Sequence, residues 1–207
     1  MNYVKIGNRK VKALETKKKI YETAEQLFKN HGFENVSVDS IVEMAGVSKG
    51  TFYVHFNSKD TLIAALIADY VEKIDIDYKS YLESLASDTT TSDKLIFLTG
   101  IIAEIIDGTI GYEHMKFIYE AQLTRTINVN VVSNYNRDIY RMFSDVISQG
   151  ILQGEFKADL SPDTISKHFL LAYRGLTYEW CIRYPDFNLK EQAIKHFKIL
   201  LTGIKKQ

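Results

Sequence analysis

The segment from Ser37 to Ile63 constrains the fold more than any other part of the chain. Apolar residues at helical spacing predict a short helix over about 38–45, and Gly46 allows the positive φ that a sharp helix end needs. Ser48 can cap a second short helix over about 49–55, and a longer helix is expected to follow from Ser58 or its neighbour. This segment therefore predicts a helix-turn-helix that leads into a third helix.

The second helix of this motif has one apolar and one polar face. Phe52 and Phe56 are four residues apart, so they form one stripe that can be buried and can fix the rotation of the helix. The donor side chains of the helix are Lys49, Thr51, Tyr53 and His55. We expect these polar groups to be held outward on a rigid support.

Helical periodicity continues through the rest of the chain, and no alternating strand pattern appears. A first helix is expected from about Ala13 to Asn30 after a mobile segment, residues 1–12. The remaining helices are expected near 58–85, 93–107 and 112–124, then over about twenty residues ending near 154, from Pro162 to before Pro185, and from Asn188 to about 204. The fold class is all-α, and the segment from Thr124 to Asn130 has no clear assignment.

Length and composition favour two domains in one chain. With 207 residues and a mass of 23.8 kDa, the chain is long enough for a small domain and a larger one. We expect a small domain with a basic arm and the helix-turn-helix over residues 1–60, and a larger helical domain, the body, over residues 61–207. The single cysteine, Cys181, and the lack of a long apolar run favour a cytoplasmic protein with no disulfide, no membrane segment and no cofactor or metal.

Charge is distributed unevenly although its formal sum is zero. Residues 1–60 contain ten Lys/Arg and seven Asp/Glu, and residues 1–19 alone contain seven Lys/Arg and one acid, Glu15. This asymmetry indicates a polyanionic partner for the first part of the chain. A solvated flexible tail is the alternative interpretation, and the sequence leaves both open.

The order of short motifs between Ala24 and Leu62 resembles the TetR family of bacterial transcriptional regulators. The matching motifs are A24-x-x-L-F28, H31-G-F33, S37-V-D-S-I41, A45-G-V-S48, G50-T-F-Y-V-H-F56 and S58-K-D-x-L62. Val36 and Val42 depart from the small or hydroxylated residues common at these positions in the family. The resemblance implies a DNA-binding repressor, with the remaining body as a variable domain for ligand binding and dimerisation.

A helix-turn-helix places its second helix in the major groove of double-stranded DNA. The candidates for base contacts are Lys49, Gly50, Thr51 and Tyr53. The candidates for phosphate contacts lie at helix ends: Ser37, Ser48, His55 and Lys59. Ser37 and Ser48 could instead act as caps alone, and His55 could pack beside Phe56.

The resemblance also implies a homodimer on a palindromic operator and a small-molecule effector in the body. The last two helices would form the dimer seam with Ile165, Phe169, Ala172, Gly175, Leu176, Ala193, Ile194, Phe197, Leu200 and Leu201; an intramolecular core is the alternative. An aromatic pocket for an amphipathic or aromatic effector would use Phe97, Ile101, Met115, Ile118, Tyr119, Gln122, Tyr135, Tyr140, Phe143 and Tyr173, each of which could also be ordinary core.

Two other classes of function compete with this interpretation. An enzyme is disfavoured because the sequence has no E-x-x-H, C-x-x-C, P-loop or G-x-S-x-G motif, and its five histidines lack ligand spacing. A helical ligand-binding or interaction protein without DNA binding is the second alternative. The polar face over residues 49–55 and the basic N-terminal segment argue against that alternative.

Overall fold

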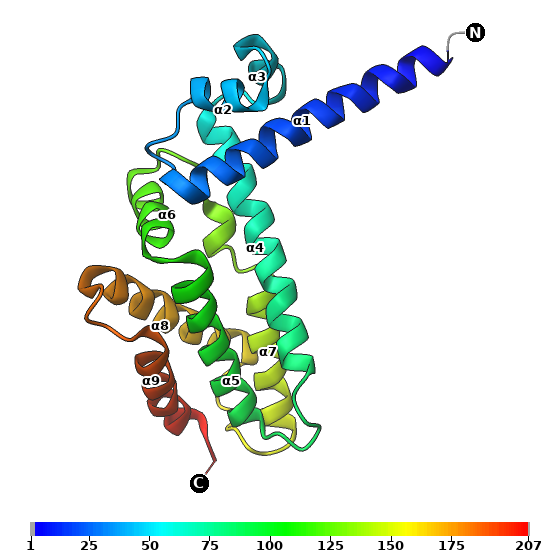
Figure 1. Cartoon of the computed structure of the whole chain (residues 1–207). Coiled ribbons are helices and arrows are strands. Elements are labelled where there is room, and N and C mark those ends of the chain that lie inside the picture. Colours follow the sequence, from blue (N-terminus) through cyan, green and yellow to red (C-terminus); the bar gives the residue numbers. More distant parts are fainter. Residues whose placement is uncertain (1–2, 207) are drawn as a thin grey trace. The chain divides into compact units, whose positions relative to one another are not determined.

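The computed structural model of the chain describes residues 3–206, and for residues 3–9 it describes the backbone alone (Figure 1). The chain forms two compact units. The first contains the residues up to Asp69 together with Glu120–Val129, and the second contains Tyr70–Tyr119 and the residues from Asn130 onward. The long helix α4 (Lys59–Glu83) continues through the change from one unit to the other, so the unit boundary lies inside a helix and not at the expected residue 60.

The first unit is built on α1 (Tyr3–His31), which packs against α2 (Val38–Ala45) and α3 (Lys49–His55). Its core contains apolar side chains from each of these helices and from the start of α4: Ile20, Ala24, Phe28, Ile41, Ala45, Phe52, Phe56 and Leu62. The predicted helix-turn-helix is confirmed, with both short helices at the expected bounds. The all-α prediction is confirmed as well, since the described residues contain helices and one isolated β-bridge, Phe156 with Lys205.

The start of α1 corrects one expectation. Residues 3–12 are helical and not a mobile segment, while residues 1–2 lie outside the described part of the chain. The segment has no proline, and most of its residues tolerate a helix, so the helix continues beyond the core that it packs on. The three lysines at 17–19 are therefore in the middle of α1, where the helix dipole does not act on them.

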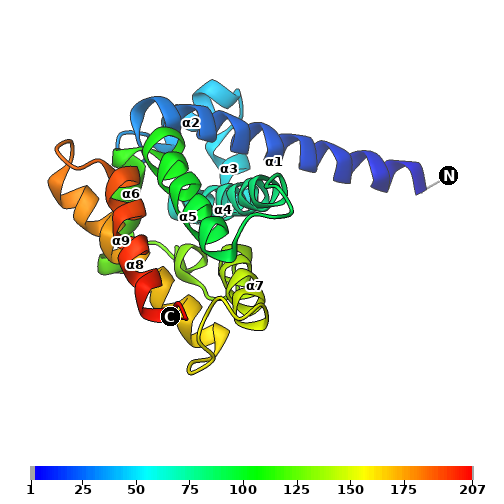
Figure 2. The same ribbon diagram turned by 90° about the horizontal axis from the view of Figure 1, so that it is seen from below.

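The second unit arranges helices around α5 (Thr91–Glu104), which packs against α7 (Asp138–Leu152) and α9 (Leu189–Ile204). The other elements of this unit are the remainder of α4, the π-helix η1 (Ile105–Ile110), most of α6 (Tyr112–Thr124), the 3-10 turn η2 (Asn130–Ser133) and α8 (Pro162–Arg183). Helix α8 packs against both α7 and α9 (Figure 2). Phe143, Phe169, Tyr173 and Phe197 form an aromatic cluster where α7, α8 and α9 meet.

Two helix boundaries in this unit differ from the expected ones. Helix α5 begins at Thr91 because Thr90 caps it, and it continues into the π-helix η1 before Gly111, with φ 78°, ends it. Helix α7 begins at Asp138, so the expected twenty-residue helix is shorter and Tyr135 lies before it. Spacing of apolar residues alone did not reveal these ends.

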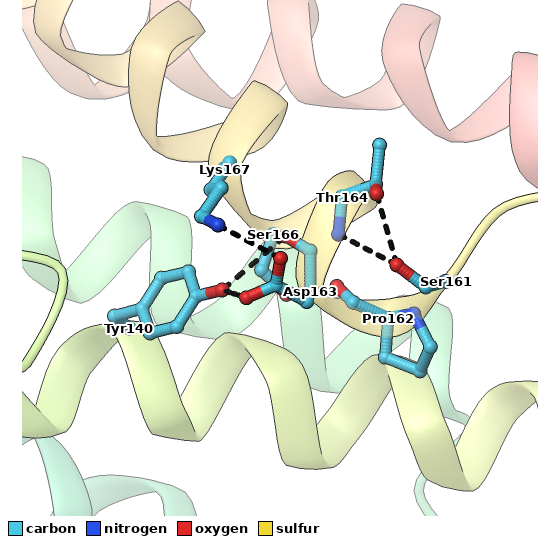
Figure 3. Close-up of polar contacts among 7 residues, drawn as sticks. All are labelled: Tyr140, Ser161, Pro162, Asp163, Thr164, Ser166 and Lys167. Atoms are coloured by element: carbon cyan, nitrogen blue, oxygen red, sulfur yellow. Dashed lines mark hydrogen bonds and ion pairs between the residues drawn. The ribbon is translucent and has the colours of Figure 1, made fainter.

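Ser161 caps the start of α8 (Figure 3). The Ser161 hydroxyl accepts from the backbone N–H of Thr164 at 3.1 Å, and Pro162 occupies the first turn. The Asp163 carboxylate forms an ion pair with Lys167 at 2.8 Å and accepts a hydrogen bond from the hydroxyl group of Tyr140 on α7. Burial and the bond to Asp163 raise the pKa of Tyr140. This contact holds the start of α8 on α7.

A carboxylate from the α7–α8 connection caps α5 from a distance in sequence. Glu155 accepts from the backbone N–H of Thr91 at 2.9 Å and from that of Ser92 at 3.0 Å. Gly150 allows the ring of Phe156, the residue after Glu155, to pack closely on α7, because a Cβ at position 150 would overlap that ring. The connection is thus fixed to the start of α5.

Within residues 3–206, no single helix has the length and apolar character needed to cross a membrane. One bent pair, Thr91–Ile110 with Tyr112–Thr124, meets the length and composition criteria together, with an angle of 98° between its parts.

Candidate nucleic-acid interface

Serine caps define the starts of the two short helices of the helix-turn-helix, and the cap of α2 is reciprocal. The Ser37 hydroxyl accepts from the Ser40 N–H at 3.0 Å, and the Ser40 hydroxyl accepts from the Ser37 N–H at 3.1 Å. Gly46 ends α2 with φ 62°, and the Ser48 hydroxyl accepts from the Thr51 N–H at 3.1 Å. Ser37 and Ser48 therefore act as caps while both remain exposed.

The rotation of α3 is set by its two phenylalanines. Phe52 is fully buried and Phe56 nearly so, with ring centroids 5.8 Å apart. The ammonium group of Lys17 lies 5.6 Å from the centroid of the Phe56 ring, so α1 contacts the end of α3 as well. This packing leaves Lys49, Gly50 and Tyr53 exposed on the outer side of α3. Of the four polar side chains expected to be held outward, Lys49 and Tyr53 are exposed, whereas Thr51 and His55 are half-buried.

One exposed apolar residue of α3 was missed by the reasoning from sequence. The side chain of Val54 is 78% exposed, and Met44 on α2 is also exposed. An apolar side chain can contact the methyl group of thymine in the major groove. The signal was the position of Val54 away from the Phe52–Phe56 stripe.

Lys49 is not a free cation in this structure. Its ammonium group lies 2.8 Å from one carboxylate oxygen of Asp39 and 3.1 Å from the other. The hydrogen bond to Asp39 raises the pKa of Lys49, which stays protonated at neutral pH. The helix-turn-helix thus presents a cation and a carboxylate side by side at the start of α3.

Lys59 has a clear role within the chain. Its ammonium group donates to the backbone carbonyls of Phe33 and Val36, each at 3.0 Å. These carbonyls belong to the connection between α1 and α2, so Lys59 ties this loop to the start of α4. Thr51 and His55 are both half-buried, and the Thr51 hydroxyl is 2.8 Å from that of Ser48.

The helix-turn-helix matches a known family. Residues 20–66 match the model of the bacterial regulatory proteins of the tetR family. The KstR2 transcriptional repressor of Mycobacterium tuberculosis is 22% identical over 191 residues, which cover 91% of this chain and 92% of that protein. The helix-turn-helix over residues 20–66 is that of the TetR family. The match and the relatives indicate a transcriptional regulator and not an enzyme.

Solved TetR-like structures share the fold along nearly the whole chain. FadR of Thermus thermophilus, a TetR-family repressor solved in complex with lauroyl-CoA, aligns with a TM-score of 0.70 and 18% identity over 92% of this chain and 96% of that one. FadR of Bacillus subtilis, solved with stearoyl-CoA, aligns with a TM-score of 0.66 and 17% identity over 90% and 98%. The TetR fold thus includes the body as well as the helix-turn-helix.

The expected effector-lining residues lie in different environments. Gln122 belongs to the first unit, and the rest belong to the second. Met115, Ile118, Phe143 and Tyr173 are buried; the half-buried ones are Phe97, Ile101, Tyr119, Tyr135 and Tyr140. Phe143 and Tyr173 are members of the aromatic cluster that packs α7, α8 and α9 together.

Two of these tyrosines use their hydroxyls to join helices of the second unit. The Tyr119 hydroxyl donates to the carbonyl of Arg174 at 3.0 Å, and the Tyr173 hydroxyl donates to the carbonyl of Thr99 at 3.1 Å. Burial raises the pKa of both. Tyr135 is different, because its ring lies against two cations, Arg174 at 5.1 Å and Lys167 at 5.7 Å.

Half of the expected dimer seam lies inside the protomer. The five buried members are Ile165, Phe169, Ala193, Phe197 and Leu201, and the half-buried ones are Ala172, Leu176, Ile194 and Leu200. Gly175 alone of the ten is exposed. The buried five belong to the intramolecular core, which was the alternative interpretation of their spacing.

A different apolar stripe of α8 faces outward. Leu171, Tyr178 and Ile182 are 50%, 46% and 61% exposed, and with Gly175 they repeat at intervals of four, three and four residues. Ile199 on α9 is 67% exposed. We call the α8 residues 171, 175, 178 and 182 the outer stripe of α8.

Proposed function

We propose that this chain is a transcriptional repressor that binds a palindromic operator as a homodimer and leaves it when a small amphipathic or aromatic effector binds. The observation that carries the proposal is the outward face of α3, held in place by the buried Phe52 and Phe56. The proposed site of action is the cytoplasm, where the DNA is.

In the proposed complex, α3 enters the major groove. Gly50 allows the backbone to approach the bases, and Thr51 and Tyr53 offer hydroxyl groups. Lys49 donates to guanine. Asp39, which is paired with Lys49, has a carboxylate that can accept from the amino group of cytosine. Ser37, Ser48 and His55 lie at helix ends, where phosphate contacts set the register.

Lys59 was expected to contact a phosphate, and the proposal now gives it a second role. Its bonds to the carbonyls of Phe33 and Val36 fix the loop before α2. If Lys59 contacts a phosphate, its ammonium group does so while the loop before α2 holds it in position. Substitution of Lys59 is therefore expected to affect stability in addition to binding.

The outer stripe of α8 supports the homodimer. A two-fold interface needs a self-complementary apolar surface, and helices approach closely at small residues. Leu171, Tyr178 and Ile182 supply apolar area, and a Cβ at Gly175 would meet no atom of the chain within 4 Å. The proposed dimer uses this stripe with Ile199, and the functional domains remain those expected, residues 1–60 for DNA and 61–207 for effector and dimer.

The effector class is supported by chemistry and by similar proteins. The body contributes aromatic and aliphatic side chains, with hydroxyl groups and the cations near Tyr135 as its polar features. Two TetR-like structures, both named FadR, hold acyl-CoA molecules. An amphipathic molecule with a long apolar part is the first class to test.

The experiment selects DNA with the full-length protein from a random-sequence duplex library, and then titrates the selected duplex. We expect an inverted repeat and a complex of two chains per duplex. Compounds that raise the melting temperature of the protein, with lauroyl-CoA in the first set, are then added to the complex, and release of DNA is expected. Failure to enrich any duplex contradicts DNA recognition, whereas enrichment of a non-repeated site bound by one chain contradicts the dimer.

A further inference from the structure

We propose that the N-terminal half of α1 is a second DNA-binding element, which holds the phosphates that flank the base pairs read by α3. This inference rests on the proposed function, because it places α1 on the same DNA. It adds a site in a part of the chain to which the TetR match, residues 20–66, does not extend.

The charge of the helix-turn-helix itself is unfavourable for DNA. Residues 20–60 contain three Lys/Arg against six Asp/Glu, whereas residues 1–19 contain seven against one. All of the net positive charge of the DNA-binding module thus precedes Ile20. A module that must approach a polyanion would be repelled without this segment.

Two of the three cations in residues 20–60 already have partners within the chain. Lys49 pairs with Asp39, and Lys59 donates to two backbone carbonyls. The third, Lys29, is in the last turn of α1. The helix-turn-helix is therefore short of the phosphate-binding cations on which the affinity of most DNA-binding proteins depends.

The cations of residues 10–19 lie along one continuous helix, α1. The first buried residue of the described side chains is Ile20, and residues 10–19 are all exposed or half-buried. Both pairs, Lys10 with Lys17 and Lys12 with Lys19, are seven residues apart, which corresponds to two turns and about 10.5 Å. In both views α1 extends beyond α2 and α3 (Figures 1 and 2).

Two contacts connect these rows to the helix-turn-helix. Lys17 lies over the ring of Phe56 at the end of α3. Lys19 lies at the end of α2, with its ammonium group 3.7 Å from the position of a Cβ on Gly46. The rows of lysines therefore begin beside α2 and α3 and continue outward along α1 to Lys12 and Lys10.

The phosphate backbone of DNA is the occupant that fits these rows. The row of Lys10 and Lys17 and the row of Lys12 and Lys19 lie on opposite sides of α1, because residues two apart in a helix are about 200° apart. Double-stranded DNA carries one negative charge per about 1.7 Å of its axis, so a helix with cations on two sides can meet phosphates on both sides of a groove. Val11 and Leu14 are exposed on the same segment and would suit a second copy of α1. Five lysines against one acid within residues 10–19 disfavour such a pair, because like charges would be brought together.

The test compares the full-length wild type with the double variant Lys10→Gln and Lys12→Gln. These two lysines are exposed, and glutamine has a helix propensity close to that of lysine. The probe is the selected duplex, made once with about ten extra base pairs on each side and once without them. For the wild type we expect tighter binding to the long duplex, and for the variant we expect equal binding to both.

Salt dependence supplies the second measurement. The slope of log Kobs against log[salt] on the long duplex should fall by about 0.9 for each lysine that contacts a phosphate in each bound chain. The variant Lys10→Arg with Lys12→Arg keeps the charge and should keep the slope. The variant Lys73→Gln with Lys79→Gln makes the same change of charge on α4 in the second unit and should leave the dependence on flanking DNA intact.

The outcomes separate this inference from the proposed function. If the wild type enriches no duplex at all, the proposed function fails. If it enriches a duplex but binds the long and short forms equally, with one slope for wild type and variant, only the role of α1 fails. If the double variant changes self-association in sedimentation without DNA and leaves the salt slope unchanged, α1 pairs with a second copy and the inference is overturned.

Discussion

Lys49, the first residue of α3, forms an ion pair with Asp39 in the first turn of α2, with 2.8 Å between the ammonium nitrogen and the nearer carboxylate oxygen. In the proposed complex, the carboxylate holds Lys49 in one direction while it places a negative charge at the DNA surface. Such a pair lowers affinity for DNA in general and favours base pairs that can bind both groups.

The first prediction replaces Asp39 with asparagine. Binding to unrelated DNA should strengthen, with a salt slope steeper by about 0.9 per chain, because the lysine charge is no longer neutralised. The ratio of affinities for the selected and the unrelated duplex should shrink, because Lys49 loses its fixed direction. Titration of both duplexes at several salt concentrations measures the two effects.

Glu43→Gln is the matched control, since Glu43 is an exposed acid of the same helix. It removes the same charge and should raise binding to unrelated DNA by a similar factor, but it should keep the discrimination. Equal discrimination in the two variants would show that Asp39 acts through charge alone.

The second prediction concerns Lys59, whose ammonium group holds the carbonyls of Phe33 and Val36. Lys59→Met should lower the free energy of unfolding by about 1–2 kcal/mol, because two carbonyls lose a charged donor. Lys29→Met, at an exposed position of α1, should cost about 0.3–1 kcal/mol through the helix dipole. Urea unfolding of both variants measures the difference, and equal costs would remove the structural role of Lys59.

Local signals in the sequence were sufficient to predict the helix-turn-helix. Ser37, Gly46 and Ser48 are caps and stops whose effect depends on adjacent residues, so the observed bounds agree with the expected ones. The start of α1 could not be predicted in the same way, since Gly7 and Asn8, residue types common at helix ends, lie inside the helix. The expectation of a mobile segment over residues 1–12 was therefore wrong for residues 3–12, where the helix continues.

The spacing of apolar residues could not predict contacts between residues that are distant in sequence. Helix α8 has apolar residues on two faces, and spacing does not indicate which face packs inward; Phe169 is buried and Leu171 is exposed. The cap that Glu155 provides for α5 joins residues 64 apart in sequence, and no local pattern announces it. The exposed face of α3 was therefore easier to predict than the exposed face of α8.

The third prediction uses the cap formed by Glu155. Burial alone would raise the pKa of this carboxyl, but hydrogen bonds from Ser92 and Thr91 outweigh it and hold the pKa below its usual value. Because the pKa is lower in the folded chain, the stabilisation is present above the unfolded pKa of about 4.3 and is lost as the pH falls through the folded value. Glu155→Gln should thus flatten the loss of stability below pH 5.

Thermal unfolding between pH 3 and pH 7 measures this effect. At pH 7 the variant should already be less stable by about 1–2 kcal/mol, because a neutral acceptor replaces a charged one. Glu72→Gln, at an exposed position on α4, is the control and should follow the wild-type pH dependence. A Glu155→Gln curve parallel to that of the wild type would contradict the cap.

The fourth prediction compares two helical glycines. A Cβ at Gly150 would overlap the Phe156 ring and lie 2.8 Å from the Thr91 hydroxyl, so Gly150→Ala should destabilise the chain by about 1–3 kcal/mol through overpacking. Gly203 in α9 has no atom within 4 Å of such a Cβ, so Gly203→Ala should stabilise it by about 0.5–1 kcal/mol. Denaturant unfolding should give opposite signs, and equal signs would contradict the close approach at Gly150.

The fifth prediction introduces a charge into the outer stripe of α8. Ile182 is 61% exposed in the chain, and in the proposed homodimer it would lie in an apolar contact around the two-fold axis. Ile182→Glu should therefore give a monomer in sedimentation at micromolar concentration, with unchanged helix content. Affinity for the selected duplex should fall by about 10²-fold, since each chain then binds its half-site without the second. Leu152→Glu, at the exposed end of α7, adds the same charge outside the stripe and should remain dimeric. If Ile182→Glu stays dimeric and Leu152→Glu does not, the dimer forms through the end of α7 and the outer stripe of α8 is not its interface.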